Sequence, residues 1–264
     1  MPPEFGHNVP MPPRKGTATG LRPLSARSVV LSLLLGTHPP ELPVRDLIRS
    51  VERFGVTEPT LRVALSRMVG AGDLHRTDAT YRLSDRLLER QRRQDDAIHP
   101  RTRAWRGDWE IAVITVTGRG PAERAELRAD LSRLRLAELR EGVWLRPANL
   151  QRPWPDRVGA LVQRFTARPD QPPHMLASTL WALDDWADTT RSLLDHFTNA
   201  TLPADRLAAA AAMVRHMVTD PILPADLLPA RWPGPDLRAT YADYQREMNE
   251  VARTGSGSGS GATQ

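Results

Sequence analysis

The stretch that decides the fold is TEPTLRVALSRMVGAGDLHRTDATYRLS, Thr57–Ser84. Its first half has apolar residues at the spacing of one helix face, which predicts an amphipathic helix over 58–70. Two short alternating segments follow, at 74–76 and 80–83, and the turn between them predicts a small hairpin. A helix followed at once by a hairpin is typical of the third helix and the wing of a winged helix-turn-helix. The predicted buried face of the helix consists of Leu61, Ala64, Leu65, Met68 and Val69.

The opposite face of this predicted helix, together with the hairpin, is rich in short polar side chains and arginines. These donor types reach base edges and phosphates when a helix lies in the major groove of DNA and a wing lies beside it. For any one arginine alone, an ordinary solvated helix face is an equally good interpretation, but the third-helix position and the hairpin together favour DNA. The predicted DNA-binding residues are Thr60, Arg62, Val63, Ser66, Arg67, His75, Arg76 and Arg82.

The distribution of charge along the chain also favours a nucleic-acid partner for the first third. The whole chain has a formal net charge of +5. Residues 1–107 hold 18 Lys and Arg against 11 Asp and Glu, a net charge of +7, whereas residues 108–264 hold 18 against 20, a net charge of −2. A basic first third is expected of a chain whose first third meets a polyanion.

Helical patterns flank the opening stretch on both sides. Ser25 is a possible N-cap for SARSVVLSLLLG, residues 25–36, and the segment PPELP separates that helix from VRDLIRSVERFG, residues 44–55. Three helices and a hairpin predict a winged helix-turn-helix domain over 24–84. The charged run DRLLERQRRQDDAI follows it and predicts a connector helix.

The middle of the chain alternates between strand and helix patterns. An apolar strand is predicted at 109–116, then an amphipathic helix from Pro121, then a second strand within 138–150. A second helical run within 155–165 and a further strand within 172–183 complete the pattern. This order indicates a small ferredoxin-like unit.

From about Asp184 the chain is helical again, and its last helix is predicted to end at Arg253. The Pro-rich segment Asp220–Gly234 interrupts these helices and is expected to form a fixed surface loop. The two ends of the chain have the composition of disordered or flexible segments. The predicted fold class is α+β, with a disordered arm at 1–23, a winged helix-turn-helix domain at 24–84, a connector helix and linker at 85–107, a ferredoxin-like middle domain at 108–183, a C-terminal helical domain at 184–253 and a flexible tail at 254–264.

Several function classes are excluded by what the sequence lacks. There is no cysteine, so disulfides and thiolate zinc sites are excluded and a reducing cytoplasm fits best. No apolar run approaches the ~20 residues of a membrane span, and the first residues do not resemble a secretory signal. We therefore expect a cytoplasmic protein with no membrane partner.

Five stretches carry a resemblance to a known family. They are LSARSVVLSLLLG at 24–36, FGVTEPTLRVALSRMVGAGDL at 54–74, WRGDWEIAVITV at 105–116, EGVWLRP at 141–147 and DPILPADLLPARWPG at 220–234. In this order they resemble the PaaX-type transcriptional regulators, named for the phenylacetic acid degradation repressor, over roughly Leu24 to Met248.

The resemblance implies a dimeric bacterial repressor with an N-terminal winged helix, a middle ferredoxin-like domain and a C-terminal helical domain. It also implies a double-stranded DNA operator and an aryl-acyl-CoA thioester as effector, phenylacetyl-CoA in the name-giving case, whose binding releases the DNA. The chain departs from the pattern in its short wing, which has Asp78-Ala79 at the turn rather than Asn-Gly or Asp-Gly.

A CoA thioester needs cations for its phosphates and an apolar slot for its acyl group. Arg140, Trp144 and Arg146 stand at even positions of one predicted strand, and Arg215 and His216 stand on an Ala-rich helix. These residues are the predicted effector-binding set, and Trp181, Trp186 and Trp232 are candidates for the slot. The competing interpretation is that the tryptophans and His216 are core residues and that the strand arginines face solvent.

Two other functions remain as alternatives, a metal-dependent nuclease or an RNA-binding protein built on the ferredoxin-like domain. Asp108 at the start of the predicted strand is a single carboxylate, whereas two-metal hydrolysis needs several converging ligands. The aromatic pattern of RNA-recognition strands is absent, as are nucleophile–base, Walker and dinucleotide motifs. The His residues are scattered, so we expect no metal site, no cofactor and no enzyme activity.

Overall fold

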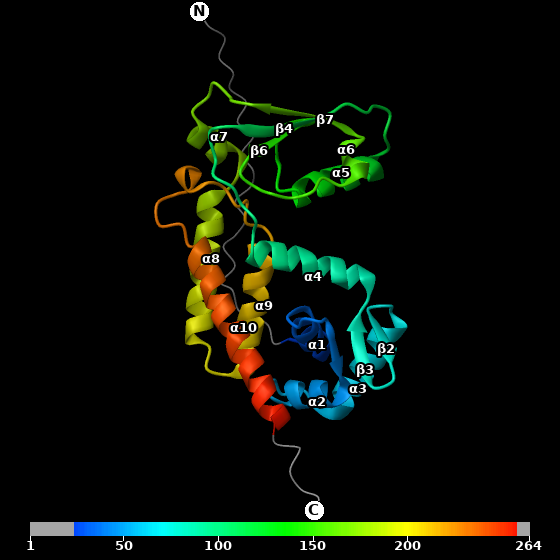
Figure 1. Cartoon of the computed structure of the whole chain (residues 1–264). Helices are drawn as coiled ribbons and strands as arrows, with labels where there is room; N and C mark the ends of the chain where they lie inside the picture. The colour runs from blue at the N-terminus through cyan, green and yellow to red at the C-terminus, as the bar shows by residue number, and fades with distance from the viewer. Residues whose placement is uncertain (1–23, 258–264) are drawn as a thin grey trace, which may run out of the picture.

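The structure, a computed structural model, describes residues 24–257. The predicted arm at 1–23 and the last residues of the predicted tail, 258–264, lie outside the described residues. The described part is α+β, as predicted. Figure 1 shows the middle domain at the top, the winged helix and the C-terminal helices together below it, and α4 (Asp85–Ile98) running across the junction.

The N-terminal part is a winged helix-turn-helix, which confirms the prediction from the opening stretch. Its small sheet has the strand order β1-β3-β2, and His75 of β2 lies opposite Arg82 of β3. The turn between these two strands holds Asp78 at a positive φ of 52°, which Asp tolerates better than most residues. The elements are α1 (Ala26–Leu35), β1 (Glu41–Pro43), α2 (Val44–Glu52), α3 (Glu58–Gly70), β2 (Leu74–Thr77) and β3 (Thr80–Leu83).

The third helix, α3, buries a narrower face than its sequence predicts. Leu61, Leu65 and Met68 are almost fully buried, where α3 packs on α1 and α2. Val69 was predicted to belong to this face but is 37% exposed, because α1 and α2 cover only one stripe of the helix. The rest of the α3 surface is left to solvent.

The middle domain has the ferredoxin-like arrangement that the sequence predicts. Its strands follow the order β5-β6-β4-β7 and every neighbouring pair is antiparallel, so each helix connects two strands that are parallel but not adjacent. The elements are β4 (Trp109–Ile114), α5 (Pro121–Arg133), β5 (Ala137–Arg140), β6 (Val143–Pro147), α6 (Asp156–Gly159) and β7 (Val162–Ala167).

Three local predictions for this domain were wrong. The single strand expected within 138–150 is a hairpin, because Gly142 takes a positive φ of 78° and turns the chain between β5 and β6. The helix expected within 155–165 is only one short turn, and the rest of that run is the edge strand β7. The strand expected within 172–183 is the helix α7 (Pro173–Leu180), which has a proline in its first turn and buries Leu176 and Ala177.

The C-terminal part is helical, as predicted, with the Pro-rich segment inserted before its last helix. That helix continues to Gly257, beyond the end predicted at Arg253. The elements are α8 (Leu183–Asn199), α9 (Pro203–Met217), the short 3-10 helix η1 (Ala225–Leu227) and α10 (Gly234–Gly257).

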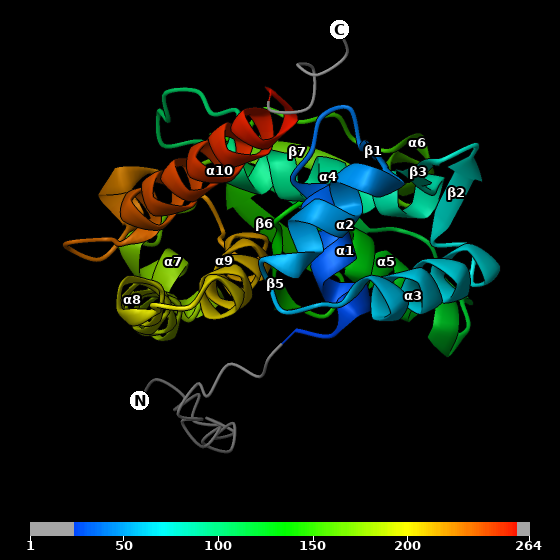
Figure 2. The same ribbon diagram turned by 90° about the horizontal axis from the view of Figure 1, so that it is seen from below.

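The winged helix and the C-terminal helices share one hydrophobic core. Leu34 of α1 and Leu65 of α3 belong to the same buried cluster as Met213 of α9 and Tyr241 of α10. Helix α9 contacts both α1 and α4, and α10 packs along α8 and α9 (Figures 1 and 2). The winged helix is therefore built onto the C-terminal helices, and α1 packs on both α3 and α9.

Candidate nucleic-acid interface and effector site

All of the predicted DNA-binding residues lie on the surface. On α3 the side chains of Thr60, Arg62, Val63, Ser66 and Arg67 are exposed, and on the wing those of His75, Arg76 and Arg82 are exposed. Val63 is 52% exposed, so an apolar side chain is also part of this surface. Figure 1 shows α3 and the wing in the lower part of the molecule, separated from the middle domain by α4.

The arginines of this surface differ in how freely they can meet DNA. Arg62 Nε donates to Glu58 Oε1 at 2.8 Å, so a carboxylate competes with DNA for this guanidinium. Arg76 Nε donates to the carbonyl oxygen of Asp78 at 2.9 Å, and its guanidinium lies 5.9 Å from the centre of the Tyr81 ring. Arg67 is exposed near the end of α3, and no side-chain partner holds it among residues 24–257. The geometry therefore favours Arg67 over Arg62 as a residue that could contact DNA directly.

One buried carboxylate, which the sequence analysis did not single out, fixes the wing against the rest of the domain. Asp73, 3% exposed, lies in the turn between α3 and β2. Its Oδ2 accepts from Arg27 Nη2 of α1 at 2.7 Å, and its Oδ1 accepts from Arg86 at the start of α4. The signal in the sequence is an acidic residue that follows the glycine-containing turn at 70–72 and precedes the basic hairpin, and this pattern alone does not indicate the two ion pairs.

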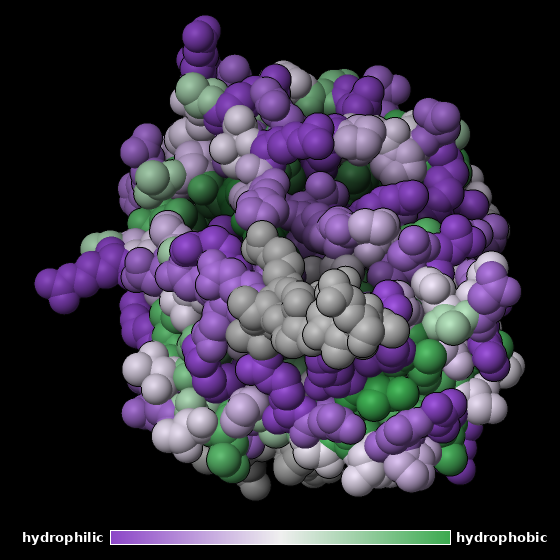
Figure 3. Space-filling view, turned by 60° about the horizontal axis from the view of Figure 1, so that its bottom comes forward, coloured by the Kyte–Doolittle hydropathy of each residue, from purple (hydrophilic) through white to green (hydrophobic). Residues whose placement is uncertain are grey.

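The surface around this end of the molecule is suited to a charged partner. Figure 3 turns the lower side of Figure 1 towards the viewer and shows a mainly hydrophilic face with hydrophobic residues in separate patches. A hydrophilic, arginine-bearing face is the usual character of a surface that meets phosphates.

The predicted effector residues do not form one site. Arg140 is exposed on β5, whereas Trp144 and Arg146 are buried on β6, so the prediction that all three share one strand was wrong. Trp144 packs into the core between the sheet and α5. Arg215 and His216 lie on α9, in a different part of the fold.

Arg146 is fully buried and its donors are already occupied. Its guanidinium donates to the carbonyl oxygens of Pro147, Arg135 and Ile222, and to Asn149 Oδ1 at 2.9 Å. Burial without a carboxylate partner lowers the pKa of Arg146 to about 9. We therefore assign Arg146 to the attachment of the middle domain to the Pro-rich segment rather than to an effector.

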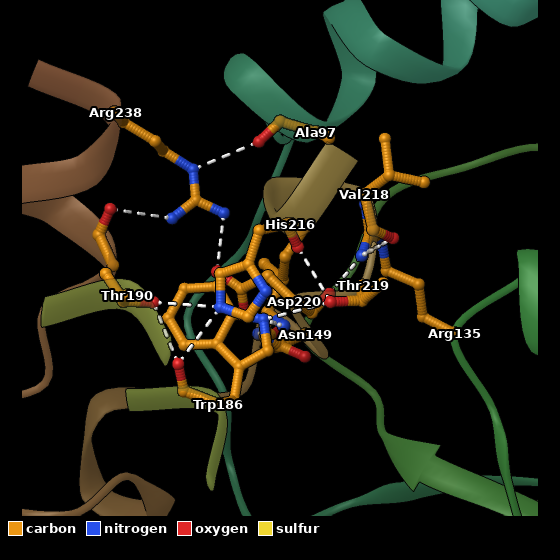
Figure 4. Close-up of polar contacts among 12 residues, drawn as sticks. Ala97, Arg135, Asn149, Trp186, Thr190, His216, Val218, Thr219, Asp220 and Arg238 are labelled. Carbon is orange, nitrogen blue, oxygen red and sulfur yellow. Dashed lines mark hydrogen bonds and ion pairs between the residues drawn. The ribbon is translucent and has the colours of Figure 1, made fainter. Parts of the chain in front are cut away.

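The Pro-rich segment begins at a junction of three parts of the chain (Figure 4). Asp220, 1% exposed, accepts from Arg238 Nη2 of α10 at 2.7 Å, and Arg238 Nε donates to the carbonyl oxygen of Ala97 in α4 at 3.0 Å. From the middle domain, Arg135 donates to the backbone carbonyl of Asp220, and Asn149 donates to that of Ile222 at 3.0 Å. This short segment thus holds α4, α10 and the middle domain together.

His216 forms part of an aromatic stack rather than an open slot. Its ring lies 4.5 Å from the ring of Trp186, which stacks at 4.6 Å on Trp232. His216 Nε2 lies 3.0 Å from the carbonyl oxygen of Trp186 and 3.0 Å from the hydroxyl of Thr190 (Figure 4). These contacts favour the interpretation of His216 and Trp186 as core residues.

The burial of His216 predicts a loss of stability in mild acid. Desolvation lowers the pKa of His216, although the Trp186 carbonyl and the charge of Asp220 oppose it. Because the unfolded chain binds the proton more readily, protonation favours unfolding. The contribution of the neutral, buried His216 to the free energy of unfolding is therefore complete above about pH 6.5 and is lost as the pH falls below that value. Thermal unfolding between pH 7.5 and 5.5 should show a smaller decrease for His216→Gln than for the parent. The exposed His196→Gln should follow the parent; parallel curves for His216→Gln and the parent would contradict the expectation.

The described residues 24–257 show no cluster of side chains that could hold the metal ions of the alternative nuclease function. Asp108 Oδ1 accepts from Arg168 Nε at 2.7 Å. Within residues 24–257, no three metal-ligating side chains of the His, Cys, Asp or Glu type gather into a group. None of the helices in the same range combines the length and apolar character needed to cross a bilayer.

Comparison with known proteins supports the arrangement of the three parts. Residues 25–87 match the family model described as PaaX-like protein, residues 102–169 that of the PaaX protein central Cas2-like domain, and residues 181–255 that of the PaaX-like protein C-terminal domain. A solved structure of the uncharacterized protein Rv0674 from Mycobacterium tuberculosis is similar over 87% of this chain and 98% of that chain, with 51% sequence identity and a TM-score of 0.76. Among curated proteins no match is found. Since the three matches cover most of the sequence in the same order, the chain belongs to the PaaX family of transcription regulators.

Proposed function

We propose that this PaaX-like regulator is a repressor that binds its operator as a homodimer through α3 and the wing, and that an aryl-acyl-CoA thioester such as phenylacetyl-CoA releases it. The observation that carries the DNA-binding part is the uncovered face of α3, where Val63 and Arg67 are exposed although the opposite face is tightly packed. PaaX-like regulators are not a family of enzymes. The repressor role and the effector class rest on the family resemblance alone.

A dimer gives this surface its specificity. Two copies of α3 would enter successive major grooves about 34–36 Å apart, or a multiple of that distance. An effector that favours a different dimer geometry needs only about 1.4 kcal/mol of differential binding to weaken operator affinity tenfold. The shared core of the winged helix and the C-terminal helices is a short route for such a change.

The test is binding of the purified protein to the DNA upstream of its own gene, by fluorescence anisotropy, with and without phenylacetyl-CoA. Arg67→Ala should weaken operator binding about tenfold or more, because a base or phosphate contact of an arginine is worth about 1–3 kcal/mol. Arg62→Ala should have a smaller effect, because Glu58 already holds this side chain.

Arg191→Ala is the matched control for the loss of one positive charge. Arg191 is also exposed on a helix and pairs with Asp188 at 2.6 Å, but it lies on α8. If Arg67→Ala and Arg191→Ala bind the operator equally well, α3 does not read DNA and the proposed function fails.

A further inference from the structure

A cavity of about 410 Å³ lies between the winged helix and the last helix of the chain. Residues of α1, β1 and α2, and of the segments that directly follow the two helices, form one wall. Residues of α10, with Leu207 of α9, form the other. Figure 1 places the end of α10 near α2, and the residues that line the cavity show that its two walls come from segments far apart in the sequence. The volume falls within the usual range of small-molecule sites.

The walls of this cavity indicate the chemistry of its ligand. The apolar side chains are Leu33, Leu42, Leu207, Tyr241 and Met248. Two arginines, Arg49 of α2 and Arg53 directly after it, also line the cavity and are exposed at the surface. An apolar interior with cations at the rim suits a molecule with an aryl or short acyl body and an anionic group.

A second observation concerns Tyr244, which also lines the cavity. Its side chain is only 7% exposed, and its hydroxyl has no hydrogen-bond partner within residues 24–257. A buried hydroxyl without a partner is costly, and a native protein usually satisfies it with water or a ligand. A polar atom of a bound molecule would supply the missing partner after a small movement of the ring.

We propose that this cavity is the effector site, and that its ligand acts as a wedge between the winged helix and α10. The inference rests on the proposed function. It adds where the effector binds and which helices its binding moves apart. Helix α3 packs on α1 and α2, whereas α10 packs on α8 and α9. A ligand that separates α1 and α2 from α10 therefore tilts α3 relative to the C-terminal helices.

A second cleft, of about 390 Å³, makes a useful contrast because its lining is different. It lies between α4 and the middle domain and is lined by Arg92, Arg93, Arg101, Arg133, Arg135 and Arg152, with the single carboxylate Asp96. Leu150, Pro153 and Val218 add apolar surface, but the six arginines make this lining far more basic than that of the first cavity, which has two. Arg93→Gln in this cleft therefore serves as a charge-matched control for Arg53→Gln in the cavity.

The first measurement uses 1-anilinonaphthalene-8-sulfonate, a fluorescent probe with an aryl body and a sulfonate. Ser50 of α2 lines the cavity, so Ser50→Trp should fill it and weaken binding of the probe at least tenfold, whereas Ser50→Ala should leave binding unchanged. Arg53→Gln should weaken it about fivefold and Arg93→Gln should not. Thermal melts of each variant show that the fluorescence does not come from unfolding. Equal probe binding by the parent and Ser50→Trp would overturn the cavity as a ligand site.

The second measurement is release of operator DNA by phenylacetyl-CoA. Ser50→Trp should bind operator within about twofold of the parent but should no longer respond to the thioester. If phenylacetyl-CoA releases Ser50→Trp as well as it releases the parent, the effector site lies elsewhere while the proposed function stands. If it does not release the parent, the proposed effector is wrong, and the probe measurement alone then decides whether the cavity binds a ligand.

Discussion

Asp220→Ala is expected to lower the free energy of unfolding by about 3 kcal/mol and the melting temperature by about 10 °C. Asp220 is buried, and its two carboxylate oxygens accept from Arg238 and from the backbone amide of Ile222. Alanine would leave the guanidinium of Arg238, which is only 19% exposed, without its carboxylate. Removing one partner of a buried pair costs more than the pair contributes, because the remaining charge stays desolvated.

The loss should also loosen the junction and not only the local turn. Ile222 has a positive φ of 51°, which is unfavourable for a β-branched residue and is held by the hydrogen bond from its amide to Asp220 Oδ1. Without that bond, the carbonyl that receives Arg146 and Asn149 is no longer fixed. Limited proteolysis should therefore cleave Asp220→Ala faster between the middle domain and α10.

Two further variants separate these causes. Asp220→Asn keeps the shape and one acceptor oxygen but removes the charge, so we expect about half of the loss. Asp226→Ala changes an exposed carboxylate in the same Pro-rich segment and should melt within about 1 °C of the parent. A melting temperature of Asp220→Ala equal to that of Asp226→Ala would show that the Asp220 pair does not hold the junction.

Local patterns in the sequence were sufficient for the winged helix. The helix predicted at 58–70 is α3 (Glu58–Gly70), and the predicted hairpin is β2 and β3. These elements are short-range, and their periodicity and glycine breaks are decided by neighbouring residues. The middle domain was predicted less well, because β7 is an edge strand whose mostly exposed side chains carry no clear alternation.

The effector candidates show why a site is harder to predict than a fold. Strand arginines usually face solvent, but the register of β6 places Arg146 against Ile222, which follows it by a long stretch of chain. Nothing near Arg146 in the sequence indicates that the carbonyl oxygen of Ile222 is one of its acceptors. The cavity between α2 and α10 has the same origin, since Arg53 and Met248 meet only through the tertiary fold.

The second large effect is expected from a negative charge on the exposed face of α3. Thr57 is the N-cap of this helix and Thr60 is its third residue, and their hydroxyls lie 2.9 Å apart. Thr60→Glu would create the sequence T-x-x-E, in which the glutamate reaches back to the N-cap amide and favours the helix. We expect a melting temperature equal to or above that of the parent. Operator binding should nevertheless fall at least 30-fold, because a carboxylate facing phosphates costs about 2 kcal/mol or more.

Thr60→Gln isolates the charge, because glutamine can form the same capping contact and has almost the same shape as glutamate. It should bind the operator much more tightly than Thr60→Glu while melting at a similar temperature. For Thr60→Glu, the melting temperature is kept or raised while operator affinity falls only if the start of α3 lies against DNA. At an ordinary solvated helix end, the glutamate would stabilise the helix without weakening operator binding. Equal operator binding by the glutamate and glutamine variants would therefore place the DNA on another surface, whatever the loss shared by both.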